Sequence, residues 1–172
     1  MILVAPLHDL DEALSRRPSH LISLSSPGAE PVELPGDVKT LRLTFHDIVR
    51  PREDLIPARR EDIVALVGFA RGWPARRPML IHCWAGVSRS PAAAYITACA
   101  RSRPGGEQAL ADRLRTAAPF ATPNARMVAL ADEILGRNGA MSAAVEAIGR
   151  GAETTIGRMF ILDFEPPRGD CR

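Results

Sequence analysis

The sequence carries little net charge. Its 22 lysine and arginine residues are balanced by 20 aspartate and glutamate residues, which leaves a formal net charge of +2. This balance gives no reason to expect nucleic acid or an acidic membrane surface as the main partner. Lysine is almost missing, because Lys39 is the only one and the other basic residues are arginines. Arginine suits bidentate contacts with oxyanions, but richness in arginine and alanine more often reflects genomic base composition.

Cysteine is also scarce, with one residue each at Cys83, Cys99 and Cys171. An odd, sparse set argues against a disulfide framework and predicts a reducing compartment, so we expect a cytoplasmic protein. The spacing of the three cysteines matches no metal site, and we expect neither a metal nor a cofactor.

Long apolar runs are missing. No stretch reaches the roughly 18 apolar residues of a membrane span, and the N-terminal MILVAPLHDLDEAL lacks the basic segment of a secretion signal. A content of 46% hydrophobic and 24% charged residues is typical of a globular chain, and 172 residues suit one domain. We predict a single domain over residues 1–164 and a flexible tail over 165–172, with no membrane partner. No feature of the sequence sets an oligomeric state.

Strand-like and helix-like segments alternate along the first hundred residues. Short apolar or alternating runs predict strands at 2–5, 20–24, 38–45 and 79–82, and helical periodicity predicts helices at 7–15, 61–70 and 90–100. Further along the chain we expect helices at about 107–117, 123–136 and 140–149, and an edge strand at 159–164. This order predicts an α/β fold, a three-layer α/β/α sandwich with a mainly parallel central sheet and a helical C-terminal half that covers one face.

The stretch HCWAGVSRS, from His82 to Ser90, stands between a predicted strand and a predicted helix. Ligands of open α/β sheets bind at that edge. A tight turn that enters a helix N-terminus directs several backbone N–H groups into one concavity, which together with the helix dipole binds an oxyanion such as phosphate. Gly86 would relieve the steric cost of the turn. Arg89 adds a planar guanidinium that can hold two phosphate oxygens.

Cys83 lies in the same field. The pKa of a free thiol, about 8.5, falls to roughly 3.5–7.5 at helix N-termini and beside cations. We therefore expect Cys83 to be a thiolate at neutral pH and to act as a nucleophile beneath the bound phosphorus. His82 is placed to orient the loop through its ring nitrogens. Ser90, or alternatively Ser88, is placed to donate a hydrogen bond to the sulfur and help it leave again.

These residues resemble the HC–x5–R–S phosphate-binding loop of the cysteine-dependent protein tyrosine phosphatases. The spacing and the Ser-Pro that follows are most similar to the dual-specificity branch, and we expect a dual-specificity-like enzyme of the bacterial type. The low-molecular-weight branch carries its loop near the N-terminus and does not fit. The resemblance implies that Cys83 forms a phosphocysteine. It also implies that phosphate is bound by the loop residues Trp84, Ala85, Gly86, Val87, Ser88 and Arg89.

The family also uses an aspartate upstream of the cysteine, on a loop after a strand, as the general acid. A carboxylic acid there protonates the leaving oxygen and then serves as base for the attacking water. Asp47 follows the strand TLRLTF and is the leading candidate, although it lies a little further upstream than usual in this branch. Asp54 is the rival, in the sequence PRED, where a surface ion pair is its ordinary role. His46 either orients Asp47 or is simply a surface residue.

Downstream, ATPNARMV resembles the Pro-Asn that begins a late helix in dual-specificity enzymes. We expect Thr122 to cap that helix with Pro123 in its first turn, and capping is also the role we favour for Asn124. The glutamine that relatives often carry just after this Pro-Asn pair is absent, which leaves open which group positions the hydrolytic water.

Cys99 lies at an apolar position of a predicted helix, and we expect it in the core. The alternative is that Cys99 is a redox partner of Cys83.

The variable loop positions Trp84, Ala85, Val87 and Ser88 include no basic residue. Relatives that act on phosphoinositides often carry lysines there, so we expect a phosphorylated protein as substrate, phosphotyrosine first, with phosphoserine and phosphothreonine left open. We expect Trp84 to pack beneath the loop rather than form a pocket wall.

Two other functions stay open, a rhodanese-like sulfurtransferase and a non-catalytic phosphopeptide-binding module. The leading His-Cys, the Ser-Pro and the upstream aspartate favour the phosphatase.

Overall fold

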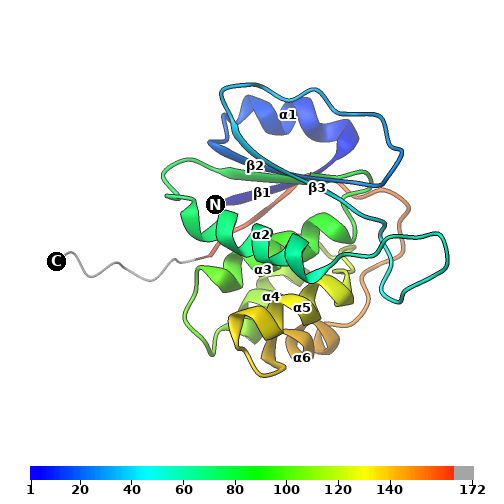
Figure 1. Cartoon of the computed structure of the whole chain (residues 1–172). Coiled ribbons are helices and arrows are strands. Elements are labelled where there is room, and N and C mark those ends of the chain that lie inside the picture. Colours follow the sequence, from blue (N-terminus) through cyan, green and yellow to red (C-terminus); the bar gives the residue numbers. More distant parts are fainter. Residues whose placement is uncertain (165–172) are drawn as a thin grey trace.

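One mainly parallel sheet forms the centre of the computed structural model, which describes residues 1–164 (Figure 1). Within that range the strand order is β3-β2-β4-β1-β5. The strands are β1 (Ile2–Pro6), β2 (His20–Ser25), β3 (Lys39–Thr44), β4 (Met79–Cys83) and β5 (Phe160–Leu162). The first four are parallel to one another, and β5 runs antiparallel to β1 at the edge. The predicted tail over 165–172, with Cys171, lies outside the described residues.

Helices cover both faces of the sheet (Figure 1). A 3-10 turn (Leu7–Asp9) and α1 (Leu10–Ser15) lie on one face. The other face carries α2 (Arg60–Gly72), α3 (Arg89–Ala100), α4 (Glu107–Ala117), α5 (Ala125–Leu135) and α6 (Ala140–Ala147). The predicted three-layer α/β/α sandwich is therefore confirmed, and the helical C-terminal half does cover one face of the sheet.

The central strand β4 is buried along its whole length because both of its faces are covered. Its side chains alternate between two apolar clusters, so that Ile81 joins the large cluster under α2–α6 and Leu80 joins the smaller one beside α1. Burial of each such side chain contributes about 1.5–3 kcal/mol relative to leaving it in water. This packing fixes the end of β4, where the candidate loop begins.

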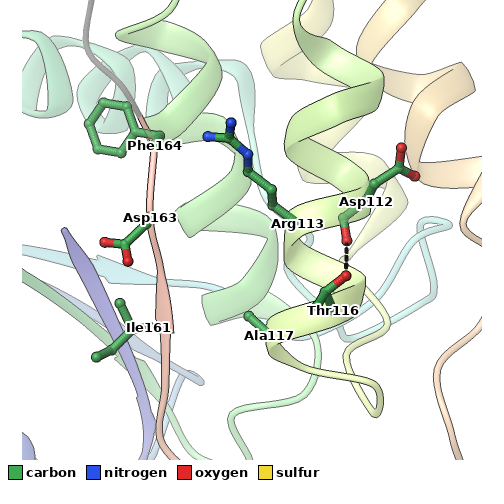
Figure 2. Close-up of a pocket in the computed structure, with 7 residues that line it drawn as sticks. All are labelled: Asp112, Arg113, Thr116, Ala117, Ile161, Asp163 and Phe164. Atoms are coloured by element: carbon green, nitrogen blue, oxygen red, sulfur yellow. Dashed lines mark hydrogen bonds between the residues drawn. The ribbon is translucent and has the colours of Figure 1, made fainter.

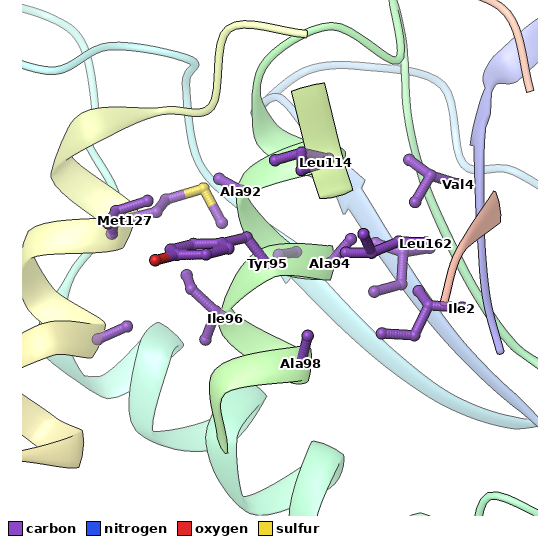
Figure 3. Packing of buried hydrophobic residues seen from close by; sticks show 14 of the residues in the cluster. Ile2, Val4, Ala92, Ala94, Tyr95, Ile96, Ala98, Leu114, Met127 and Leu162 are labelled. Atoms are coloured by element: carbon purple, nitrogen blue, oxygen red, sulfur yellow. The ribbon is translucent and has the colours of Figure 1, made fainter. Parts of the chain in front are cut away.

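Helix α3 is buried on all sides and carries mostly small residues. Figure 3 shows Ala94 of α3 facing Leu162 and Ile2 of the sheet, while Tyr95 points toward Met127 of α5. The hydroxyl of Tyr95 donates to the Glu107 carbonyl at 3.1 Å. Because small side chains let a helix approach its neighbours closely, α3 packs tightly between the sheet and the outer helices. This packing fixes the position of its N-terminus.

Predicted and observed elements differ mainly at their ends, as is usual for helix boundaries. One difference has a clear cause, because the helix predicted over 123–136 begins only at Ala125. Asn124 caps it by accepting a hydrogen bond from the Met127 N–H at 3.1 Å. The prediction that Thr122 caps this helix was wrong, since its hydroxyl accepts from the Gly151 N–H instead. Within residues 1–164, none of the helices is both long and apolar enough to span a membrane.

Candidate active site

The candidate site forms where parallel strands end together. Strands β1 to β4 share one direction, so the segments that follow them meet at one edge of the sheet. Strand β4 lies between β1 and β2 in the sheet. The loop from Cys83 to Arg89 is therefore flanked by Leu7 after β1, Ser26 after β2 and Asp47 after β3.

Four carbonyl groups of this loop accept hydrogen bonds from backbone N–H groups elsewhere in the chain. The pairs are Leu7 to Trp84 (3.0 Å), Gly157 to Ala85 (2.8 Å), Thr122 to Val87 (2.8 Å) and Asn124 to Ser88 (3.3 Å). A trans peptide points its C=O and the next N–H in opposite directions. Carbonyls held outward in this way turn the following N–H groups away from those partners, as an anion-binding nest requires.

Cys83 lies at the floor of the loop with only 3% of its surface exposed. Its sulfur accepts a hydrogen bond from the Gly86 N–H at 3.3 Å and lies 3.1 Å from the Ser90 hydroxyl. Helix α3 begins at Arg89, so the N-terminal end of the helix dipole lies close to the thiol. The sulfur is thus surrounded by the Gly86 N–H, the Ser90 hydroxyl and the start of α3.

Gly86 is the residue at which the turn needs glycine. Its φ angle is +71°, and a Cβ built there would lie 2.9 Å from the backbone nitrogen of Pro6. Any other residue would meet both the left-handed backbone strain and a main-chain collision. The predicted role of Gly86 in the turn therefore has a steric reason in this structure.

Arg89 is 5% exposed and is anchored through one of its nitrogens. Nη1 donates to the Phe45 carbonyl at 2.8 Å and to the Ser26 hydroxyl at 3.1 Å. Nε is buried and has no hydrogen-bond partner among the described residues. A buried donor that makes no hydrogen bond is costly, and a bound oxyanion would accept one from it.

Asp47 is brought to the rim of the same loop. Its Oδ1 accepts hydrogen bonds from the Ser88 hydroxyl at 2.8 Å and from the Asn124 amide at 2.7 Å, and its Oδ2 lies 3.9 Å from Arg89 Nε. Asp54, the rival candidate, lies in an exposed turn with a φ of +64°. In residues 1–164 no hydrogen bond or ion pair joins Asp54 to the loop. The geometry therefore favours Asp47.

The two histidines near the site have different surroundings. His82 is 2% exposed, and burial, together with the positive charge of Arg42, lowers its pKa to about 4. Neither of its ring nitrogens has a hydrogen-bond partner in the described part of the chain, so the expected orientation of the loop through these nitrogens is not observed. His46 Nδ1 accepts from the Ile56 N–H at 2.9 Å. That bond closes the loop that carries Asp47.

Trp84 is 63% exposed, and the expectation that it packs beneath the loop was wrong. Trp84 instead lines a small cavity of about 160 Å³, together with Cys83, Arg89 and Glu30. It is thus part of a pocket wall.

Cys99 is a core residue, as expected. It lies near the far end of α3, about 15 Å along the helix from Arg89 at 1.5 Å per residue. It is 1% exposed, and burial raises its pKa to about 12. Such a thiol is poorly suited to resolve an oxidised Cys83, so the geometry does not support a redox partnership between them.

Three contributions to the site escaped the sequence interpretation. Asn124 was expected only as a cap, yet its amide also binds Asp47. Ser26 and the Phe45 carbonyl hold Arg89, and the Gly157 N–H holds the loop at Ala85. The Pro-Asn pair was a usable signal for Asn124. The other contacts come from main chain or from a common serine, which leave no motif.

Other cavities lie away from this edge of the sheet. Figure 2 shows a groove of about 590 Å³ between α4 and β5, lined by Asp112, Arg113, Thr116, Ala117, Ile161, Asp163 and Phe164. None of the predicted site residues lines it. Within the described range, no three or more His, Cys, Asp or Glu side chains are grouped in a way that would hold a metal ion.

Comparison with known proteins shows the fold. The structure is similar to the crystal structure of DUSP15, with a TM-score of 0.59 over 89% of this chain and 94% of that chain, at 20% sequence identity. It also matches OH1 from the Orf virus, described as a tyrosine phosphatase with triple substrate specificity, at 19% identity over 84% of this chain and 79% of that chain. The TM-score of that match, 0.44, is too low to support a conclusion.

Comparison at the level of sequence identifies no family. The chain matches no protein-family model, and no curated protein matches it significantly. At 20% identity the similarity to DUSP15 shows a common phosphatase-like fold and does not extend to the chemistry.

Proposed function

We propose that this chain is a cysteine-dependent phosphatase that hydrolyses phosphotyrosine in proteins through a phosphocysteine intermediate. Phosphoserine and phosphothreonine are the further substrates to test. The observation that carries the proposal is the convergence of three groups on one loop. They are the hydrogen-bonded sulfur of Cys83, the anchored guanidinium of Arg89, whose Nε makes no hydrogen bond among the described residues, and the carboxylate of Asp47. This set of groups supplies a nucleophile, an oxyanion holder and an acid.

In the first step the Cys83 thiolate attacks phosphorus. A P–S bond forms while the P–O bond to the tyrosyl oxygen breaks, and Asp47 gives its proton to that oxygen. Arg89 and the loop N–H groups hold the three non-bridging oxygens and stabilise the charge on them. Asp47 Oδ1 is held by Ser88 and Asn124, so Oδ2 is the oxygen we assign to the proton.

In the second step a water molecule attacks the phosphocysteine. Asp47, now a carboxylate, takes a proton from the water, the P–S bond breaks, and inorganic phosphate forms. The electron pair returns to the sulfur of Cys83, which the Ser90 hydroxyl stabilises from 3.1 Å. The enzyme thereby returns to its starting state without an external cofactor in the proposed cycle.

The substrate assignment rests on the walls of the loop. Its variable positions carry no lysine or arginine, which disfavours a polyphosphorylated lipid headgroup. Trp84 presents an exposed indole beside the nucleophile and offers an aromatic surface to a tyrosyl ring. The proposal includes a reducing compartment such as the cytoplasm, because Cys83 has to remain a free thiol. Among the cysteine-dependent phosphatases, we assign the chain to the dual-specificity-like enzymes of the bacterial type.

Substitution of the nucleophile tests the proposal. We expect Cys83→Ser to abolish hydrolysis of p-nitrophenyl phosphate and of phosphotyrosine peptides while tungstate still binds. The matched control is Cys99→Ala, which replaces a buried cysteine near the far end of α3, away from the site, and should keep activity. Turnover by the Cys83→Ser variant would disprove the assignment of Cys83 as the nucleophile.

Two results with the unmodified protein would identify another function. Transfer of sulfur from thiosulfate to cyanide, without phosphatase activity, would identify a sulfurtransferase. Binding of phosphopeptides without turnover would identify a binding module.

A further inference from the structure

The chain between α6 and β5 passes directly beside the candidate loop. We call residues 149–159 the C-terminal strap. It is tied down at both ends, by a bond from the Ala152 N–H to the Pro119 carbonyl at 2.9 Å and by one from the Met159 N–H to Asp9 Oδ2 at 2.9 Å. Residues 152–156 between these ends are exposed to solvent. The strap is therefore surface chain that several specific bonds hold in place.

The strap contacts the phosphate-binding loop itself at one point. The Gly157 N–H donates to the Ala85 carbonyl at 2.8 Å. The next N–H along the loop, that of Gly86, points the opposite way and binds the sulfur of Cys83 at 3.3 Å. The Ala85–Gly86 peptide group is therefore held on both sides. The Gly157 N–H binds its carbonyl from outside the loop, and the sulfur of Cys83 accepts its N–H on the inside.

A second, indirect contact supports the same loop. The Gly151 N–H, near the start of the strap, donates to the Thr122 hydroxyl at 3.1 Å. Thr122 in turn donates its N–H to the Val87 carbonyl at 2.8 Å. Two of the four outward carbonyls of the loop are therefore supported by the strap, one directly and one through Thr122.

The two glycines of these contacts are sterically required. A Cβ at Gly151 would lie 2.4 Å from the carbonyl carbon and oxygen of Phe120, and a Cβ at Gly157 would lie 2.5 Å from Cε2 of its ring. The ring of Phe120 is itself held by an edge-on contact with Phe160 of β5, at 6.1 Å between centroids. Only a residue without a side chain lets the strap approach Phe120 closely enough to reach Ala85.

We propose that the C-terminal strap is part of the oxyanion-binding machinery, with Gly157 as a positioning residue. Its N–H holds the Ala85 carbonyl outward and so directs the Gly86 N–H into the phosphate-binding loop. The strap makes no contact with substrate in this role. This inference rests on the proposed function, because it assigns the strap to the same anion site.

A pair of double variants isolates the N–H of Gly157. Phe120→Leu removes the ring atoms that a new Cβ would strike. Phe120→Leu/Gly157→Ala then keeps the backbone donor, whereas Phe120→Leu/Gly157→Pro adds a side chain at the same place but has no N–H. We expect the proline variant to bind tungstate roughly threefold to tenfold more weakly than the alanine variant, as for loss of one hydrogen bond. Equal affinities would overturn the proposal.

The single variant Gly157→Ala gives a second test that does not depend on proline. Its Cβ collides with the Phe120 ring and displaces the strap, so tungstate binding should weaken, and the added Phe120→Leu should restore it. The Gly86 amide resonance should shift with the loss and return with the rescue, which a general loss of stability would not produce. Weak binding in the double variant, or an unmoved Gly86 resonance, would contradict the positioning role.

Gly68→Ala is the matched control. Gly68 lies exposed in α2, and a Cβ there has no atom within 4 Å. This variant should bind tungstate as the unmodified protein does and melt at the same or a higher temperature. If the unmodified protein binds tungstate but hydrolyses no phosphoester, the proposed function fails, while the comparison of the variants still decides the role of the strap.

Discussion

The side-chain amide of Asn124 donates a 2.7 Å hydrogen bond to Asp47, a residue 77 positions earlier in the chain. The same side chain caps α5 through its oxygen, which accepts the Met127 N–H. Asn124 is 3% exposed, so water does not compete freely for either contact. One buried side chain thus joins the start of a helix to the proposed general acid.

These two roles of Asn124 can be separated by substitution. Asn124→Ser keeps a good cap but removes the amide donor, whereas Asn124→Ala loses both. We expect Asn124→Ser to lower kcat roughly threefold to tenfold, as for loss of one hydrogen bond, with little change in Tm. Asn124→Ala should lower kcat similarly and destabilise the fold by about 1 kcal/mol more. Wild-type kcat in a folded Asn124→Ser variant would show that the contact does not position Asp47.

Removal of the acid should depend on the leaving group. Asp47→Asn is close in shape and still accepts the Ser88 and Asn124 bonds, but it carries no proton to give. We expect kcat to fall by about 10²–10⁴-fold for phenyl phosphate and phosphotyrosine, and less for p-nitrophenyl phosphate, whose leaving group needs less protonation. Asp54→Asn is the matched control and should leave kcat unchanged. A loss confined to Asp54→Asn would transfer the acid role to that residue.

Ser90 should matter in the second step. Its hydroxyl lies 3.1 Å from the Cys83 sulfur, and it is completely buried. We expect Ser90→Ala to slow breakdown of the phosphocysteine about 10- to 100-fold, as for loss of a hydrogen bond to a charged group. Stopped-flow hydrolysis of p-nitrophenyl phosphate should then show a burst of about one nitrophenolate per enzyme. Uniform slowing without a burst would place the effect of Ser90 before the intermediate.

Burial of His82 predicts a loss of stability in acid. The pKa of this histidine is lowered from 6.5 to about 4, mainly by burial, so the folded state resists its protonation. As the pH falls from about 6.5 to about 4, the unfolded chain binds a proton at this residue and the folded chain does not. The free energy of unfolding should decrease by up to about 3 kcal/mol over this window and change no further below it on account of this residue.

Urea unfolding at pH 7.5 and pH 4.5 measures this contribution. His82→Gln lacks the titrating ring, while all carboxylates are common to both proteins and cancel in the comparison. The unmodified protein should therefore lose more stability than His82→Gln between the two pH values. An equal loss in both proteins would show that His82 does not resist protonation in the folded state.

Much of the fold was predictable because the determining features are local. Alternating and continuous apolar runs mark strands and helices, and their order along the chain implied a mainly parallel sheet covered on both faces, as observed. The cap of α5 was misassigned to Thr122, because serine, threonine and asparagine are all good caps. Only the surrounding chain, which engages Thr122 elsewhere, selects Asn124.

Trp84 shows the limit of predictions from residue type. A large apolar side chain is usually buried, but Trp84 is 63% exposed and lines a cavity beside Cys83. Residue type describes what a side chain prefers. Whether the preference is met depends on how the distant segments of the chain pack around that position.

The amino-acid sequence by itself determined which groups stand together in the candidate loop, namely a cysteine, a glycine at a turn and an arginine, between a strand and a helix. Residues this close in sequence meet because their spacing along one short loop brings them together. The sequence already made Asp47 the leading candidate over Asp54, and only the tertiary structure shows its contact with Asn124 and brings Asn124, Ser26 and Gly157 to the loop. Those contacts join segments far apart in the chain, and most are made by single polar atoms or by backbone. No periodicity or motif encodes them, because they follow from how the whole sheet and its covering helices pack.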